Sequence, residues 1–123
     1  LLEAVKNGKN VLCEKAITVN ARQLDEVIKI AREKNVVVAE AMTIYHMPLY
    51  KKLREMIDSG VLGEIKMVQV NFGSYKEFDP ENRFFSKDLA GGALLDIGVY
   101  AASFVRFFME RKPNVVMSTV KYF

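Results

Sequence analysis

The feature that most constrains the fold is the order of three segments within the first forty residues. An apolar run is followed by an amphipathic stretch and then by a second apolar run. Asn10-Val11-Leu12-Cys13 is typical of a short buried strand, and residues 36–39 are typical of a parallel strand covered on both faces. Between them, Asn20 and Gln23 have the spacing of a helix N-cap and its capping box. The apolar residues that follow recur at helical spacing: Leu24, Val27, Ile28 and Ala31. This order predicts a βαβ unit, and therefore an α/β fold.

The pattern changes after residue 44. Pro48 is favoured at the first position of a helix, which we expect to carry one apolar stripe as far as Gly60. From Glu64 apolar and polar residues alternate, as in a sheet with one covered face. The apolar members of that alternation are Val68, Val70 and Phe72.

The last fifty residues predict a loop, a helix and a strand. Residues 73–90 have no clear period and are expected to form a long loop, a feature that is often functional. A helix is predicted from Ala93 to about Glu110, and Pro113 prevents its continuation. Val115 to Phe123 has the pattern of a strand. We therefore expect two parts, residues 1–44 and residues 45–123.

Charge and composition exclude several classes of partner. The 18 basic and 15 acidic residues are scattered, with no basic block that would neutralise a row of phosphates, so nucleic acid is not an expected partner. No apolar run approaches the ~18 residues needed to cross a bilayer, and a cytoplasmic protein without a membrane partner is expected. The single cysteine, Cys13, is interpreted as a small core residue, and His46 has no second metal ligand at a suitable spacing. No metal site is expected.

Neither end of the sequence has the signals of a natural domain boundary, which suggests a fragment.

Two polar segments are candidates for a functional site. Glu14-Lys15 follows the first predicted strand, and ligands of parallel sheets gather at the carboxyl ends of strands. Asp96 and Tyr100 lie four positions apart behind a glycine pair, so a helix would present them on one face. A lysine, an aspartate and a tyrosine are sufficient for proton transfer, because a nearby cation stabilises a phenolate.

Four segments resemble the glucose-fructose oxidoreductase, inositol dehydrogenase and rhizopine catabolism (Gfo/Idh/MocA) family of NAD(P)-dependent oxidoreductases. Gly8 to Lys15 resembles the family's Gly-Lys-His-Val-Leu-Cys-Glu-Lys-Pro segment, and Ala39 to Pro48 resembles its Glu-Ala-Phe-Met-Tyr-Arg-Phe-His-Pro segment. Asp58 to Ile65 and Asn82 to Tyr100 complete the match in the same order. The tyrosine at position 100 resembles the dihydrodiol dehydrogenase branch.

The resemblance implies a fold and an activity. The chain would hold the C-terminal part of a Rossmann-type dinucleotide-binding domain, residues 1–44, joined to the start of an α+β domain with an open sheet, residues 45–123. The parent protein would transfer hydride between NAD or NADP and a hydroxyl carbon of a small-molecule sugar, polyol or dihydrodiol. An alternative is a non-catalytic relative that binds a sugar-like metabolite or regulates a partner. A homo-oligomer through the C-terminal sheet is also expected, because unpaired strand edges invite association.

The same resemblance implies roles for five side chains. Tyr100 would donate or accept the proton at the substrate hydroxyl, Lys15 would be its electrostatic partner and a cofactor contact, and Asp96 would orient substrate or ring. Glu14 would contact the ribose or nicotinamide region of the cofactor. Arg83 would clamp a substrate or a phosphate, or equally hold its loop by an ordinary ion pair.

The chain departs from the family pattern at two places that concern the site. Ala16 replaces the family's proline, so the turn that aims Lys15 is expected to be less rigid. The glycine-rich turn that approaches a pyrophosphate does not occur among the 123 residues, so this piece alone is expected to be inactive and to bind NAD(P) weakly.

Each site residue also has a purely structural interpretation. Lys15 could be a solvated lysine at a strand end, and Asp96 could complement the dipole of the helix that it opens. Tyr100 could be a core aromatic with its hydroxyl at the surface.

Overall fold

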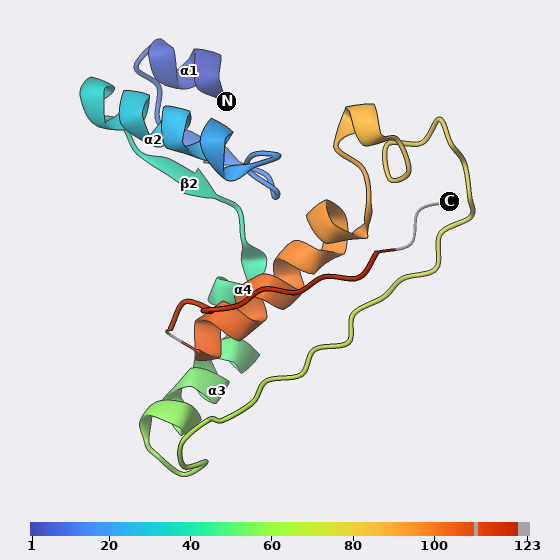
Figure 1. Ribbon diagram of the computed structural model, residues 1–123. Coiled ribbons are helices and arrows are strands. Elements are labelled where there is room, and N and C mark those ends of the chain that lie inside the picture. The colour runs from blue at the N-terminus through green and yellow to red at the C-terminus, as the bar shows by residue number, and fades with distance from the viewer. Residues whose placement is uncertain (110, 121–123) are drawn as a thin grey trace.

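The computed structural model of the chain describes residues 1–109 and 111–120 (Figure 1). An N-terminal body contains α1 (Leu2–Lys6), β1 (Val11–Cys13), α2 (Ala21–Lys34) and β2 (Val38–Glu40). β1 and β2 pair in parallel, with Val11 opposite Val38 and Cys13 opposite Glu40. The predicted βαβ unit and the α/β class are therefore confirmed.

Both ends of α2 follow from its sequence. The Asn20 side chain accepts a hydrogen bond from the Gln23 backbone N–H at 3.1 Å, which satisfies one of the donors that a helix start leaves unpaired. The Gln23 side chain in turn accepts from the backbone N–H of Val19. Asn35 ends the helix in the left-handed conformation, with φ of 51°.

The core of the N-terminal body lies on one face of the two-stranded sheet. Val5 of α1 is fully buried against Val27 and Ala31 of α2, and Val11 and Val38 of the sheet pack against this cluster. Leu12 and Val37 project from the sheet and are exposed. The prediction that the second strand is covered on both faces is thus wrong within this chain, because both helices pack on the same side.

The second part is built from two helices that cross below the N-terminal body in Figure 1. A 3₁₀ turn (Thr43–His46) leads into α3 (Pro48–Asp58), which begins at the proline as predicted. The predicted helix after Ala93 is a π-helical turn (Leu94–Gly98) followed by α4 (Val99–Phe108), while residue 110 lies outside the described part. Aromatic rings join the two helices, with the Tyr50 and Phe104 centroids 5.7 Å apart.

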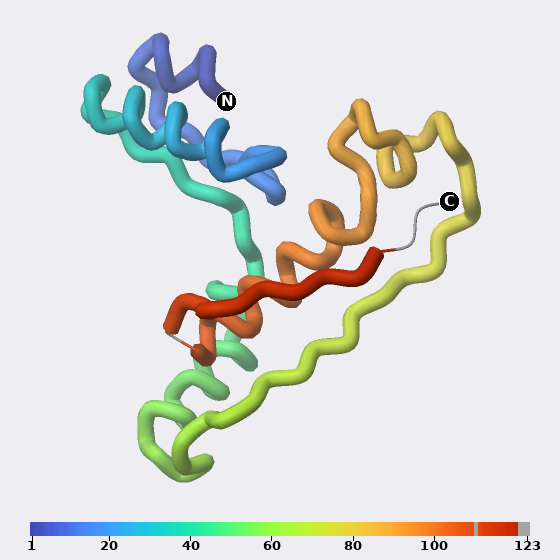
Figure 2. Tube along the Cα trace, viewed as in Figure 1, coloured from blue at the N-terminus to red at the C-terminus, as the bar shows by residue number. Residues whose placement is uncertain are grey.

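The segments predicted as strands in this part do not form a sheet. Residues 64–79 run as an extended arm beside α4, and residues 111–120 run in front of the same helix in the view of Figures 1 and 2. Val68 and Val70 are half-buried and their neighbours exposed, so the period of two persists. Neither segment pairs its backbone with a described neighbour, and a strand requires such pairing. The strand predictions are therefore wrong for residues 64–72 and 115–120, and residues 121–123 lie outside the described part.

The predicted long loop is organised where it approaches α4. Residues 82–92 form a closed turn in which Gly91 donates to the Ser86 carbonyl and Gly92 donates to the Phe84 carbonyl, both at 2.8 Å. A Cβ atom on Gly91 would lie 2.4 Å from the Arg83 carbonyl oxygen. Only glycine fits at this position, so the path of the loop requires Gly91.

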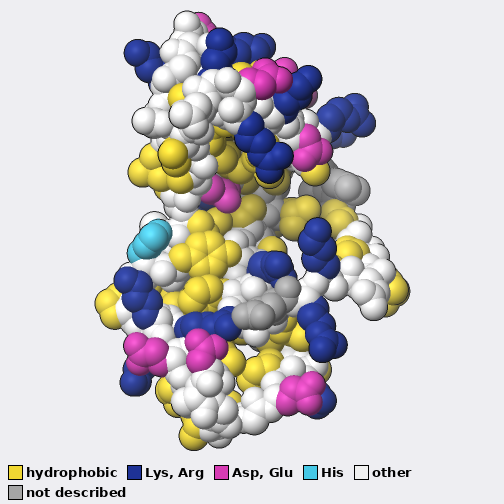
Figure 3. All heavy atoms as spheres, turned by 90° about the vertical axis from the view of Figure 1, so that its left-hand side faces the viewer, with side chains coloured by type: hydrophobic (Ala, Val, Ile, Leu, Met, Phe, Trp, Pro, Cys, Tyr) yellow, Lys and Arg dark blue, Asp and Glu magenta, His cyan; other side chains and the backbone are white. Residues whose placement is uncertain are grey.

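In contrast to the expectation from sequence, one stretch of the described residues, Lys87–Phe108, is long and apolar enough to cross a membrane by length and composition alone. It is not one continuous helix, because residues 90–92 separate the 3₁₀ turn Lys87–Leu89 from the helix that follows. Figure 3 shows apolar side chains gathered along the middle of one face, and the only histidine, His46, exposed beside them.

Candidate active site

Lys15 connects the N-terminal body to the π-helical turn. It lies just beyond the carboxyl end of β1, and its Nζ donates to Asp96 Oδ1 at 2.9 Å and to the Asp96 backbone carbonyl. The two side chains are only 16% and 20% exposed, so this ion pair is shielded from most of the solvent. It joins residues 81 positions apart in the sequence. Shielded, charge-assisted hydrogen bonds of this kind are stronger than ordinary surface ion pairs.

Tyr100 meets the same ammonium group. Lys15 Nζ lies 5.0 Å from the centroid of the Tyr100 ring, within the range of a cation–π interaction. The Phe72 ring packs edge-on against the Tyr100 ring with centroids 6.1 Å apart. The structure thus brings Lys15, Asp96 and Tyr100 together as one group, which we call the Lys–Asp–Tyr cluster. Their roles in chemistry stay a prediction.

The cluster sits where the helix is locally widened. Asp96 is the central residue of the π-helical turn Leu94–Gly98, and its backbone N–H donates to the Gly92 carbonyl at 3.2 Å. Single π-helical turns are rare and frequently occur at functional sites. The sequence pattern predicted a regular helix here, and periodicity alone does not reveal such a turn.

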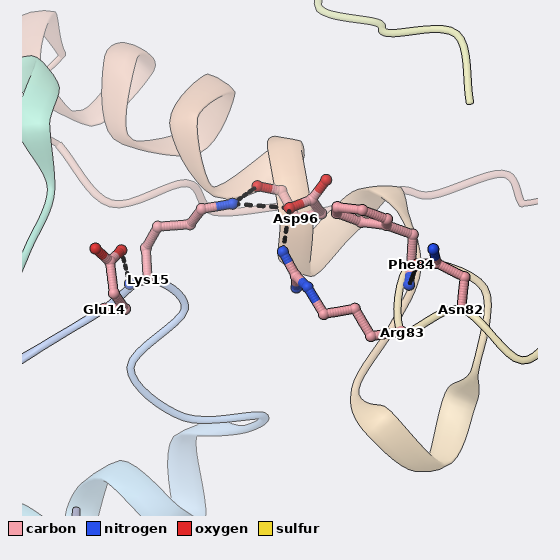
Figure 4. A network of polar contacts seen from close by, with 6 residues as sticks. All are labelled: Glu14, Lys15, Asn82, Arg83, Phe84 and Asp96. Carbon is pink, nitrogen blue, oxygen red and sulfur yellow. Dashed lines mark hydrogen bonds and ion pairs between the residues drawn. The ribbon is translucent and has the colours of Figure 1, made fainter. Parts of the chain in front are cut away.

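Arg83 approaches Asp96 from the other side. Its Nη2 lies 4.0 Å from the same Oδ1 atom that Lys15 contacts, and its guanidinium lies 4.2 Å from the centroid of the Phe84 ring. Figure 4 shows Lys15 and Arg83 pointing toward Asp96 from separate parts of the chain. Arg83 is 66% exposed, so it lies at the rim of the cluster.

Glu14 lies apart from the cluster. Its side chain is exposed and turns back to accept a hydrogen bond from the Lys15 backbone N–H at 3.3 Å (Figure 4). Among the site residues predicted from sequence, Glu14 is therefore the one that the structure does not bring to Asp96.

Glu40 is a supporting residue that the sequence analysis missed. Its Oε1 accepts a hydrogen bond from the Ile17 backbone N–H at 2.9 Å, which ties the segment after Lys15 to the end of β2. The peptide bond between Lys15 and Ala16 is cis. The rule that drew attention to Glu14 and Lys15, a polar residue following a buried strand, would also have found Glu40.

A cavity of about 200 Å³ with Lys76, Phe84 and Asp96 in its lining adjoins the cluster. Two further cavities flank it. One, of about 180 Å³, lies between the segment after β1 and the loop, and its lining includes Lys15, Thr18, Arg83 and Asp96. The other, of about 380 Å³, is largely apolar and is lined by Tyr100 together with Ile44, Met47, Tyr50, Phe72 and Phe104. A ligand that reached the cluster would therefore meet a charged side and an apolar side.

Two family models match the chain. Residues 50–123 match a model described as the GFO/IDH/MocA C-terminal domain. Residues 1–42 match a model described as an oxidoreductase family with an NAD-binding Rossmann fold.

Individual relatives match along nearly the whole chain. The trans-1,2-dihydrobenzene-1,2-diol dehydrogenase of Xenopus tropicalis is 40% identical over 94% of this chain and 35% of its own length. The D-xylose 1-dehydrogenase (NADP(+)) of Hypocrea jecorina is 36% identical over 97% of this chain and 34% of its own. The dTDP-3,4-didehydro-2,6-dideoxy-alpha-D-glucose 3-reductase of Actinomadura kijaniata is 34% identical over 97% of this chain and 36% of its own length. The chain thus spans about a third of the length of these relatives.

Proposed function

Because this chain belongs to the GFO/IDH/MocA oxidoreductase family, we propose that the whole protein exchanges a hydride between NAD or NADP and a hydroxyl-bearing carbon of a small molecule. The observation that carries the proposal is the Lys–Asp–Tyr cluster, in which one shielded ammonium contacts both a carboxylate and a phenol ring. The substrate class is a sugar, a polyol or a dihydrodiol, and the names of the relatives support this range.

The reaction leaves a proton for the protein to move. When an alcohol is oxidised, the hydride takes two electrons from the carbon, and the proton that remains on the hydroxyl must pass to a base. Tyr100 is suited to that role, and in the reverse direction its hydroxyl returns the proton to the carbonyl oxygen. Lys15 stabilises the phenolate that forms, because its charge lies 5.0 Å from the ring. Asp96 holds Lys15 in place and is a positioning residue.

The residues present fit one end of the cofactor. A bound nicotinamide supplies the hydride chemistry. Lys15 and Glu14 follow β1 at the carboxyl end of a parallel sheet, where such ligands are bound. An ammonium and a carboxylate suit the amide and hydroxyl groups of a nicotinamide riboside. The 123 residues do not include the glycine-rich turn that approaches the pyrophosphate, so these residues do not supply that contact.

We further propose that the whole protein self-associates through the region after residue 60. Large apolar side chains are exposed on both of its extended segments, among them Met67 and Phe72 on the arm and Val115, Val116 and Met117 near its end. Extended, unpaired backbone with apolar side chains favours pairing with another chain.

The proposal is tested by Tyr100→Phe in the full-length protein, with Tyr75→Phe as the matched control, since Tyr75 is 90% exposed. Turnover is measured with NAD and with NADP on a panel containing trans-1,2-dihydrobenzene-1,2-diol, D-xylose and polyols. Tyr100→Phe should lower kcat by about 10²- to 10⁴-fold, the usual contribution of a positioned acid or base, while the control stays at the wild-type rate.

Unchanged turnover in Tyr100→Phe would eliminate the proton role. If the wild-type protein turned over no member of the panel with either cofactor while still binding one of them, the non-catalytic alternative would replace the proposal.

A further inference from the structure

We propose that Arg83 and Lys15 together form a binding site for an anionic group, a phosphate or a carboxylate, carried by the substrate or by the cofactor. The inference deepens the proposed function, because the site adjoins the Lys–Asp–Tyr cluster. It rests on the cavity of about 180 Å³ between the segment after β1 and the loop that carries Arg83.

Charge balance at the cavity favours an anion. Its lining contains two cations, Lys15 and Arg83, and a single carboxylate, Asp96. Both cations approach the same carboxylate oxygen, at 2.9 Å and 4.0 Å. The cavity wall therefore carries a net charge of about +1, and a bound anion would neutralise it.

Arg83 is not fully engaged by Asp96. A separation of 4.0 Å exceeds hydrogen-bond length, and no hydrogen bond of the guanidinium is found within residues 1–109 and 111–120. Asp96 Oδ1 already accepts a hydrogen bond from Lys15. The planar guanidinium can donate two parallel hydrogen bonds to a phosphate or carboxylate, and such pairs are among the strongest polar contacts in proteins.

Contacts within the protein orient the Arg83 side chain without a ligand. Its guanidinium rests on the Phe84 ring at 4.2 Å, and the Arg83 backbone belongs to the turn that Gly91 closes. Figure 4 shows its side chain extended toward Asp96. A side chain held in this way loses less conformational entropy on binding than a mobile one.

The size of the cavity selects a single group. Pockets for whole drug-sized ligands measure about 300–1,000 Å³, whereas this cavity has about 180 Å³. One phosphate or carboxylate fits the smaller space, while the rest of the ligand extends toward Tyr100.

The test titrates the full-length protein with inorganic phosphate at constant ionic strength and follows the rise in Tm, since a ligand that binds the native state stabilises it. Wild type should show a saturable rise that yields a Kd. Arg83→Gln should raise that Kd by at least about tenfold, because a charge-assisted pair is lost, and Arg83→Lys should fall between them. Lys29→Gln is the matched control, since Lys29 is an exposed cation on α2 and lines none of the cavities at the cluster.

Kinetics then identify the source of the anion. Phosphate that competes with NADP would assign the group to the cofactor, and phosphate that competes with the oxidised substrate would assign it to the substrate. Each variant is compared with itself in the absence of phosphate, so a loss of stability does not mimic a loss of binding. The Tm readout needs no turnover, so it stands or fails separately from the proposed function.

Absence of any phosphate-dependent rise in Tm of the wild type would overturn the inference. An unchanged Kd in Arg83→Gln would overturn it equally, because the phosphate would then bind elsewhere.

Discussion

At the scale of single residues, the site depends on which groups contact the oxygens of Asp96. Its Oδ1 and its backbone carbonyl both accept from Lys15, while Arg83 stands 4.0 Å away. One carboxylate therefore determines where the ammonium sits relative to Tyr100. A conservative change at this position should alter chemistry more than binding.

Asp96→Asn keeps the shape of the side chain and removes its charge. We expect kcat to fall by about tenfold, because a charge-assisted hydrogen bond is roughly twice as strong as a neutral one, while KM changes little. Asp88→Asn, at an exposed residue of the 3₁₀ turn Lys87–Leu89, should leave both constants unchanged. A rise in KM with constant kcat would contradict the positioning role and indicate direct contact with the substrate.

At the scale of elements, the loop that carries Arg83 depends on one glycine. A Cβ on Gly91 would meet three backbone oxygens, those of Arg83, Ser86 and Phe84, at 2.4, 2.7 and 2.9 Å. Backbone atoms cannot turn aside as a flexible side chain can, so the turn would have to open. A Cβ on Gly73, in the extended arm, would meet no atom within 4 Å, so this glycine offers a matched comparison.

Gly91→Ala should therefore loosen residues 82–92 and speed their amide hydrogen exchange, while Gly73→Ala should not. Hydrogen exchange followed by mass spectrometry on the full-length protein measures both. Equal protection of this loop in Gly91→Ala and wild type would show that the close contacts do not hold it.

Sequence signals predicted some elements correctly and others wrongly, depending on whether the contacts that form the element are local. Local signals predicted the start of α2 correctly, because Asn20 and Gln23 contact each other across three positions. Strand signals succeeded at β1 and β2, which pair with each other. They failed at residues 64–72, because a period of two records which side chains are covered but not whether a partner strand is present. They failed at residues 115–120 as well, where every side chain is exposed. The π-helical turn was missed for a similar reason, since apolar spacing does not distinguish it from a regular helix.

The site was predictable to the extent that its residues follow simple rules. Lys15 follows a buried strand, and Asp96 and Tyr100 are spaced to share a helix face, so the sequence supplied all three members of the cluster. The contact of Arg83 with Asp96 depends on the path of a loop, and no local pattern encodes that path.

At the scale of the whole molecule, apolar surface is left uncovered on the arm and on residues 115–120. We predict that the full-length protein is an oligomer, which multi-angle light scattering measures directly. Met67→Lys and Met117→Lys, at side chains that are among the most exposed, should shift the population toward the monomer. A wild-type protein that remains monomeric at every concentration would contradict the proposed self-association.

The central claim is that Lys15 and Tyr100 act as one unit, and a double-mutant cycle on kcat/KM tests it most directly. The full-length protein is compared with Lys15→Met, Tyr100→Phe and the double variant. Because each partner acts through the other, the double variant should lose no more than about threefold beyond the more damaged single variant, as is typical of groups that act together. Losses that simply multiply would contradict the account, because they would show that the ammonium and the phenol work independently.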